Sequence, residues 1–156
     1  MQFPDESNAF QALHVKLLLR SFEELTGRSL VTRSGNERED ARALFTSPFF
    51  VASHNTEEDP VLTYGNQTAL DLFEMEWDEF TSTPSRFTAE TPERAERERL
   101  LEAVRTSGFI DDYSGIRISK TGKRFLIKQA TVWNLIDETG SRVGQAATFA
   151  GWEPLS

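Results

Sequence analysis

Two glycine-bearing turns divide the last third of the chain into three β-rich runs, and this pattern constrains the fold most. The runs cover residues 109–119, 123–137 and 142–152, and Lys120-Thr121-Gly122 and Glu138-Thr139-Gly140 separate them. Short glycine-containing turns between such runs predict β-hairpins. We therefore expect three long antiparallel strands that follow one another in sequence.

Shorter elements precede these strands. A strand over 49–54, a turn and a second strand over 61–64 are followed by helices over 67–74 and 92–107. Because the strands and helices do not alternate as βαβ units, this order predicts an α+β fold. The expected sheet is antiparallel and five-stranded, with the short helices on one face.

An N-terminal helix is predicted from about Ser7 to Thr26, where apolar residues recur at helical spacing. Two apolar faces are present, whereas a surface helix needs only one. We expect one face to pack on the sheet and the other to meet a second copy of the chain. The residues expected to form this homodimer are Phe10, Leu13, Leu17, Leu18 and Phe22. Residues 1–40 are accordingly predicted to be a cap or dimerisation segment, and residues 41–156 the main domain.

Composition excludes several classes of protein. The 156 residues contain no cysteine, which excludes disulfides, thiolate zinc sites and cysteine nucleophiles. Acidic residues outnumber basic ones 25 to 17, so direct nucleic-acid binding, which needs a basic surface, is not expected. No apolar run approaches the roughly 20 residues of a membrane span. We expect a cytoplasmic protein without a membrane segment.

Metal binding and catalysis are not expected either. His14 and His54 are the two histidines, and their separation matches no zinc motif. Asp111, Asp112 and Tyr113 could supply acid–base chemistry, but adjacent residues of a strand do not all share a face. The sequence therefore predicts a protein that is not an enzyme.

Alternation along the three long strands predicts a pocket. Side chains two residues apart share a face, and one face mixes aromatic rings with hydrogen-bonding groups, a composition typical of small-molecule sites. The residues expected on that face are Tyr113, Arg117, Gln129, Thr131, Trp133, Gln145 and Phe149. Phe73 and Phe87 are expected to add walls from the helical region. The opposite face carries small side chains, and we expect the N-terminal helix to pack there.

Arg117 is the residue on which this prediction depends most. An inward guanidinium could hold a carboxylate or phosphate through two parallel hydrogen bonds. The alternative is an internal ion pair with Asp71, Glu74 or another acid on the covering helices. The neutral groups Gln129, Thr131 and Gln145 could contact a ligand or satisfy one another across strands. The sequence leaves these alternatives open.

Two segments resemble a known family. Residues 64–73, YGNQTALDLF, are similar to the strand-to-helix passage of PAS domains, and residues 122–149 are similar to their C-terminal hairpins. Over residues 10–152 the chain resembles the PAS-related MEKHLA family more closely, above all at 47–90 and 108–152. The resemblance implies a five-stranded sheet and helices that enclose a cavity, a sensory role, and dimers formed through an N-terminal helix. It supplies no ligand and no catalytic residue.

Departures from better-understood PAS classes narrow the choice of cofactor. Flavin photochemistry and covalent chromophores in PAS domains use a cysteine, and haem-binding members usually supply a helical histidine. The chain has no cysteine, and residues 67–107 contain no histidine. Flavin held without photochemistry stays open, haem is not expected, and the cofactor is undetermined. Because Arg117 lies on the polar-aromatic face, we expect a sensory module that binds a small anionic metabolite. The alternative is a ligand-free interaction or dimerisation module whose aromatic side chains fill the core.

Overall fold

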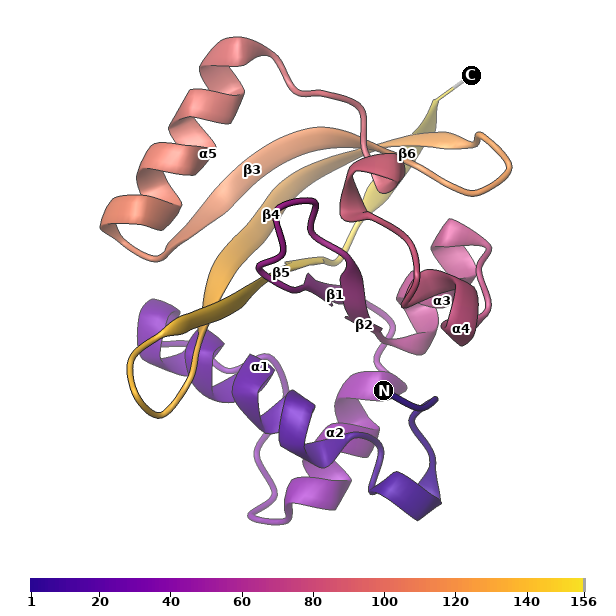
Figure 1. The fold of residues 1–156 in the computed structure, drawn as a ribbon, viewed down its shortest axis with the longest axis vertical. Coiled ribbons are helices and arrows are strands. Elements are labelled where there is room, and N and C mark those ends of the chain that lie inside the picture. The colour runs from indigo at the N-terminus through magenta and orange to yellow at the C-terminus, as the bar shows by residue number, and fades with distance from the viewer. Residues whose placement is uncertain (156) are drawn as a thin grey trace.

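The computed structural model describes residues 1–155, arranged around one antiparallel sheet (Figure 1). In chain order the elements are η1 (Glu6–Asn8), α1 (Ala12–Thr26), α2 (Glu37–Phe45), β1 (Phe50–His54), β2 (Leu62–Gly65), α3 (Gln67–Phe73), α4 (Trp77–Phe80), η2 (Ser85–Thr88), α5 (Arg94–Thr106), β3 (Phe109–Ile118), β4 (Arg124–Ile136), β5 (Arg142–Phe149) and β6 (Trp152–Leu155). The strands lie in the order β2-β1-β5-β4-β3, and β6 pairs with the first part of β4. The predicted α+β class and antiparallel sheet are confirmed, and β6 extends the five expected strands.

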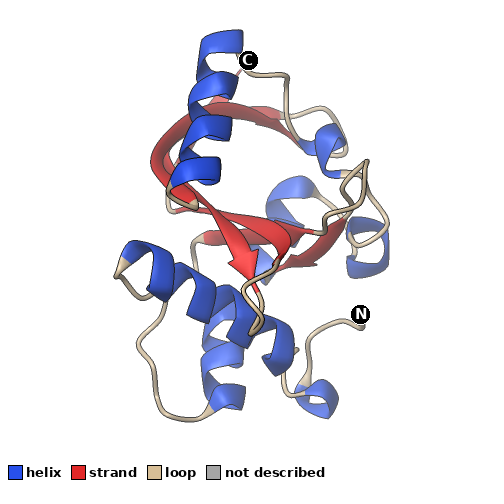
Figure 2. Cartoon of the chain, turned by 60° about the vertical axis from the view of Figure 1, so that its left-hand side comes forward, coloured by secondary structure: helices blue, strands red, loops and turns tan. Residues whose placement is uncertain are grey.

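Helices cover both faces of the sheet (Figure 2). α1 packs on β4, and α2 packs on α1, so these two helices form one layer. On the other side α5 packs on β3 and α3 packs on β1. The N-terminal helix lies on the opposite face from α3 and α5, as expected, whereas α2, a short helix expected on the other face, packs beside it. In the described part of the chain, no helix is long and apolar enough to cross a membrane.

The N-terminal helix begins later than the sequence predicts. Ala9, Phe10 and Gln11 have φ angles of 52°, 55° and 58°, so the chain turns sharply before α1 begins at Ala12. Leu18 and Phe22 are buried within their own chain, 0% and 4% exposed. These two side chains are therefore not available to a partner, and the expected dimer surface needs this correction.

Among the residues predicted to form the dimer surface, Leu13 is the most exposed. Its side chain is 85% exposed, whereas Leu17 is partly buried against the core. Phe10 lies outside the helix under the guanidinium of Arg38, 6.0 Å from the ring centre. The second apolar side of α1 is thus covered mainly by the chain itself.

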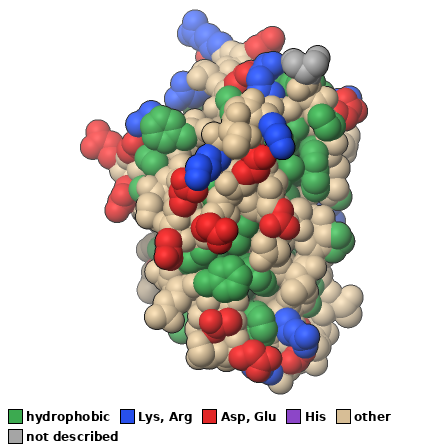
Figure 3. Space-filling model, turned by 90° about the vertical axis from the view of Figure 1, so that its right-hand side faces the viewer, with side chains coloured by type: hydrophobic (Ala, Val, Ile, Leu, Met, Phe, Trp, Pro, Cys, Tyr) green, Lys and Arg blue, Asp and Glu red, His purple; other side chains and the backbone are tan. Residues whose placement is uncertain are grey.

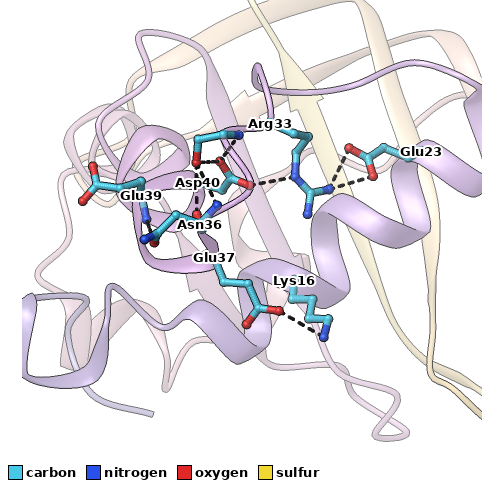
Figure 4. Close-up of polar contacts among 8 residues, drawn as sticks. Lys16, Glu23, Arg33, Asn36, Glu37, Glu39 and Asp40 are labelled. Carbon is cyan, nitrogen blue, oxygen red and sulfur yellow. Dashed lines mark hydrogen bonds and ion pairs between the residues drawn. The ribbon is translucent and has the colours of Figure 1, made fainter.

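A buried carboxylate joins the loop after α1 to α2 (Figure 4). Asp40 is 3% exposed and accepts hydrogen bonds from Arg33 Nε at 2.8 Å and from both the amide and hydroxyl of Ser34 at 2.8 Å. Arg33 also pairs with Glu23 on α1 at 2.7 Å. Despite the opposing effect of burial, these hydrogen bonds and the Arg33 charge lower the pKa of Asp40. The cluster ties α1 to α2 through one arginine.

Asn66 joins α3 to the sheet. It caps α3 by accepting from the amide of Ala69, and it also accepts from the amide of Val51, both at 3.1 Å. Its amide group donates to the carbonyls of Phe49 and Leu44 at 2.8 and 3.2 Å. The side chain is fully buried, with its polar atoms all in use. This asparagine is the one in the PAS-like segment recognised in the sequence.

A β-bulge in β4 changes which residues face the cavity side. Tyr113 of β3 pairs with Ala130 and Gly115 pairs with Ile127, so β4 carries one extra residue in this interval. Gln129 lies in the bulge with a φ of 58° and is exposed. A one-residue insertion moves every later side chain to the other face. Val132 therefore lies where alternation predicts Trp133.

Candidate functional site

A cavity of about 510 Å³ lies between the sheet and the elements that cover it. This volume is within the range of small-molecule sites. The sheet contributes Phe50, Ala52, His54, Tyr113, Arg117, Val132, Gln145 and Ala147 to the lining. The segment 85–92 and the α5 residues Arg97, Leu100 and Leu101 form the opposite wall. Phe73 of α3 and Leu62 of β2 also line it.

Arg117 supplies a charge to the lining that lacks a counter-ion within the described residues. Its backbone forms a bridge with Ala89, which holds the covering segment against β3. Burial lowers the pKa of its guanidinium, with a smaller opposing effect from Tyr113. The residue is partly exposed, and it makes no hydrogen bond or ion pair to residues 1–155. The group still carries its proton at neutral pH, because an arginine is not deprotonated in proteins.

The acids that could have paired with Arg117 are engaged elsewhere. Glu74 accepts from Ser119 at 2.8 Å and from Thr121, and it pairs with Lys123 at 2.9 Å. Asp71 accepts from Gln67 at 2.8 Å. The internal ion pair that the sequence left open is therefore not formed with either acid.

Tyr113 leans along β3 toward Arg117. A side chain at Gly115 would meet its ring at 3.2 Å and its hydroxyl at 3.6 Å, so glycine leaves the space that the ring takes. Burial raises the pKa of Tyr113. The phenol therefore stays protonated at neutral pH and can donate a hydrogen bond next to the guanidinium.

His54 and Gln145 lie opposite each other on β1 and β5. His54 Nδ1 is 2.8 Å from the carbonyl oxygen of Asn55. Burial lowers the pKa of His54, and the positive charges of Arg142 and Arg117 lower it further. The imidazole is therefore neutral at pH 7. His54 and Arg117 both line the cavity.

The other charged groups of the lining have partners or lie at the surface. Glu90 pairs with Arg124 at 2.5 Å, and Arg86 pairs with Asp59 at 3.1 Å. Arg97 is exposed on α5. The enclosed part of the cavity therefore carries about one net positive charge, that of Arg117.

The structure brings four of the nine predicted site residues to the cavity: Arg117, Tyr113, Gln145 and Phe73. Phe149 shares their face and stacks behind Phe50, with ring centres 4.3 Å apart.

The other four lie elsewhere. Gln129 is in the exposed bulge, and Thr131 and Trp133 turn toward the α1 side, where Trp133 meets Phe22 at 5.0 Å between ring centres. Their expected placement was wrong because alternation was counted through the bulge. Phe87 is 57% exposed and lies beneath Arg86 at 4.2 Å.

Several lining residues were not predicted from the sequence. Phe50, Ala52 and His54 line the cavity from β1, while Val51 is buried on the α1 side and Ser53 meets His14 there at 3.0 Å. The alternation of this short strand could have identified them. The α5 residues carry no such signal, because the position of that helix over the sheet depends on tertiary packing.

The outer surface of α3 and α4 carries several acidic side chains (Figure 3). Asp71, Glu76, Asp78 and Glu79 are exposed there. Among the residues that the structure describes, no group of three or more potential ligands could hold a metal ion.

The fold, an antiparallel sheet with a cavity beneath its covering helices, is that of a PAS-like domain. A family model described as the MEKHLA domain matches residues 12–154. The chain therefore belongs to the MEKHLA domain family, as its sequence segments indicated.

Solved structures agree with this class. The PAS domain of a Colwellia psychrerythraea protein matches with a TM-score of 0.59 and 13% identity, over 76% of this chain and 95% of that one. The LOV domain of the Erythrobacter litoralis EL346 blue-light activated histidine kinase matches with a TM-score of 0.54 and 16% identity, over 70% and 98%. The light-state dimer of the fungal blue-light photoreceptor Vivid matches with a TM-score of 0.52 and 14% identity, over 65% and 76%. At these identities the likeness concerns the fold. No curated protein sequence matches the chain.

Proposed function

We propose that this chain is a non-catalytic sensory module that binds a small anionic metabolite in the cavity between β1, β3–β5 and α5. The observation that carries the proposal is Arg117, whose guanidinium borders the cavity without a counter-ion among residues 1–155. Arg117 is only partly exposed, and a charge that has lost part of its water without gaining a partner costs free energy. An anionic ligand would supply the missing partner.

The cavity volume supports this proposal over the ligand-free alternative. A self-filled core requires the aromatic side chains to occupy the space under α5. About 510 Å³ lies there instead, next to Phe50 and Phe73. The alternative also assigns no role to an arginine without a partner.

Native mass spectrometry of the freshly purified protein tests the proposal. Extra mass that disappears on denaturation, and that is absent from Arg117→Met, would support it. Arg97→Met, which removes a guanidinium at the exposed mouth, is the matched control and should keep the extra mass. If no anion co-purifies, and none in a metabolite screen binds wild type more tightly than Arg117→Met, the proposal is wrong.

Homodimerisation is also part of the proposal. Leu13 is 85% exposed on α1, and Vivid, a structural neighbour, is described as a dimer in its light state. Light scattering after size-exclusion chromatography should give the mass of two chains for wild type and of one chain for Leu13→Glu. A monomeric wild type at high micromolar concentration would contradict it.

A further inference from the structure

The charge and the lining residues of the cavity restrict the chemistry of its ligand more than the cavity volume does. Resting on the function proposed above, we propose that the ligand is a monocarboxylic acid with an aromatic or branched apolar body. Its carboxylate lies between Arg117 and Tyr113, and its body lies along the apolar wall formed by Phe50, Phe73 and Val132.

The charge of the enclosed space sets the charge of the ligand. Arg117 contributes one positive charge, the imidazole of His54 is neutral, and the phenol of Tyr113 keeps its proton. The carboxylate of Glu90 is held by Arg124. A ligand of charge −1 would therefore balance the interior, whereas a phosphate monoester brings nearly two charges at pH 7.

The donors around Arg117 fit a carboxylate. A guanidinium can donate two parallel hydrogen bonds to the two oxygens of one carboxylate. Each oxygen retains a further lone pair. The hydroxyl of Tyr113, which donates to no residue from 1 to 155, leans over Gly115 toward the same place and can donate to one of them. Two neighbouring donor groups thus converge on one anionic site.

The apolar part of the lining disfavours a second charge on the ligand. Phe50, Phe73, Leu62, Val132 and Leu100 supply large apolar side chains to the remaining wall, which also includes the polar residues Ser85, Thr88 and Gln145. A second carboxylate placed against the apolar side chains would lose its water without gaining hydrogen bonds, which is unfavourable. An apolar body would instead remove these side chains from water, which is favourable. The cavity therefore favours an amphipathic acid over succinate or inorganic phosphate.

Isothermal titration calorimetry with four probes tests this ligand class. The probes are 4-phenylbutyrate, its neutral analogue 4-phenylbutanamide, succinate and inorganic phosphate. We expect 4-phenylbutyrate to bind one per chain and at least tenfold more tightly than each of the others. Arg117→Met should remove the preference for the acid over the amide, and Arg97→Met should keep it.

A second variant separates a local effect from a folding defect. Tyr113→Phe removes a hydroxyl that has no partner among the described residues, so the fold should be unaffected. It should weaken 4-phenylbutyrate several-fold and 4-phenylbutanamide less, because a neutral carbonyl accepts a weaker hydrogen bond than a carboxylate does. Equal loss for both probes would contradict the placement of the carboxylate.

The two proposals fail in different ways. Succinate or phosphate binding at least as tightly as 4-phenylbutyrate, with loss in Arg117→Met, would overturn the apolar acid and leave the anion sensor standing. Equal binding of acid and amide, insensitive to Arg117, would overturn both. No measurable binding of 4-phenylbutyrate to wild type would also reject the ligand class argued here.

Discussion

Replacing Arg117 with methionine should leave the fold at least as stable as wild type. The change removes no hydrogen bond or ion pair to residues 1–155, and it relieves the burial that lowers the pKa of the guanidinium. Methionine keeps an unbranched stem of similar reach along the wall. Replacing buried charges by apolar groups is often neutral or stabilising. We expect a free energy of unfolding between equal to wild type and about 1 kcal/mol higher.

Arg33→Met is the matched comparison, because Arg33 has the partners that Arg117 lacks. It holds Asp40, whose side chain is 4% exposed, at 2.8 Å, and Glu23 at 2.7 Å. A hydrogen bond to a charged group contributes about 1.5–3 kcal/mol. Since Arg33 itself is 37% exposed, solvent screens part of this, and a loss of about 2 kcal/mol is expected.

Urea unfolding of wild type and both variants measures the difference. Tryptophan fluorescence reports on the core, because Trp77 and Trp133 are buried. Far-UV circular dichroism checks that unfolding is two-state. A loss of 2 kcal/mol or more in Arg117→Met, equal to that in Arg33→Met, would refute the reasoning. It would mean that Arg117 holds the fold together through a contact.

Three further predictions concern the elements that frame the cavity. Asn66→Ala should lower the free energy of unfolding by about 4 kcal/mol, because four buried backbone groups lose their partner. The control Asn36→Ala removes one exposed cap bond and should lower it by about 1 kcal/mol. Equal losses in urea unfolding would contradict this. Hydrogen bonds from Thr121, Lys123 and Ser119 lower the pKa of Glu74 to about 2, so its stabilising contribution is complete above pH 4.5 and is lost as the pH falls toward 2. The urea midpoint should therefore drop more between pH 6.5 and pH 3 for wild type than for Glu74→Gln. Equal drops would contradict the stabilising role of these Glu74 contacts. Gln129→Gly should stabilise the protein by about 0.5–1 kcal/mol, because Gln129 has a φ of 58°, and a lower melting temperature would contradict strain at the bulge.

The strand order of the C-terminal half could be predicted from its turns. Gly122 and Gly140 have φ angles of 90° and 86°, a conformation that favours glycine, so these two positions mark the hairpins in the sequence. The sheet face of β5 could also be predicted, because Gln145 lies on an uninterrupted strand. Regular alternation is reliable where no residue is inserted.

The bulge in β4 could not be predicted in the same way. Lys128 and Gln129 are ordinary strand residues, and neither glycine nor proline marks the inserted position. Because alternation was counted through the bulge, Thr131 and Trp133 were predicted on the wrong face of the sheet, and Val132 was not predicted to line the cavity. The side on which a bulge places its neighbours depends on the pairing with β3, which is a long-range property.

Stability and binding of the Arg117→Met variant together decide what the cavity is for. A variant that is as stable as wild type and no longer distinguishes 4-phenylbutyrate from its amide would show a charge kept for a ligand. A variant that is as stable and binds both probes like wild type would show a guanidinium that is merely hydrated in the cavity. Only the first result is expected, because Tyr113 places a second donor beside Arg117, and Gly115 leaves the space that this arrangement needs. An arginine that is merely hydrated needs neither a second donor beside it nor the space left by glycine.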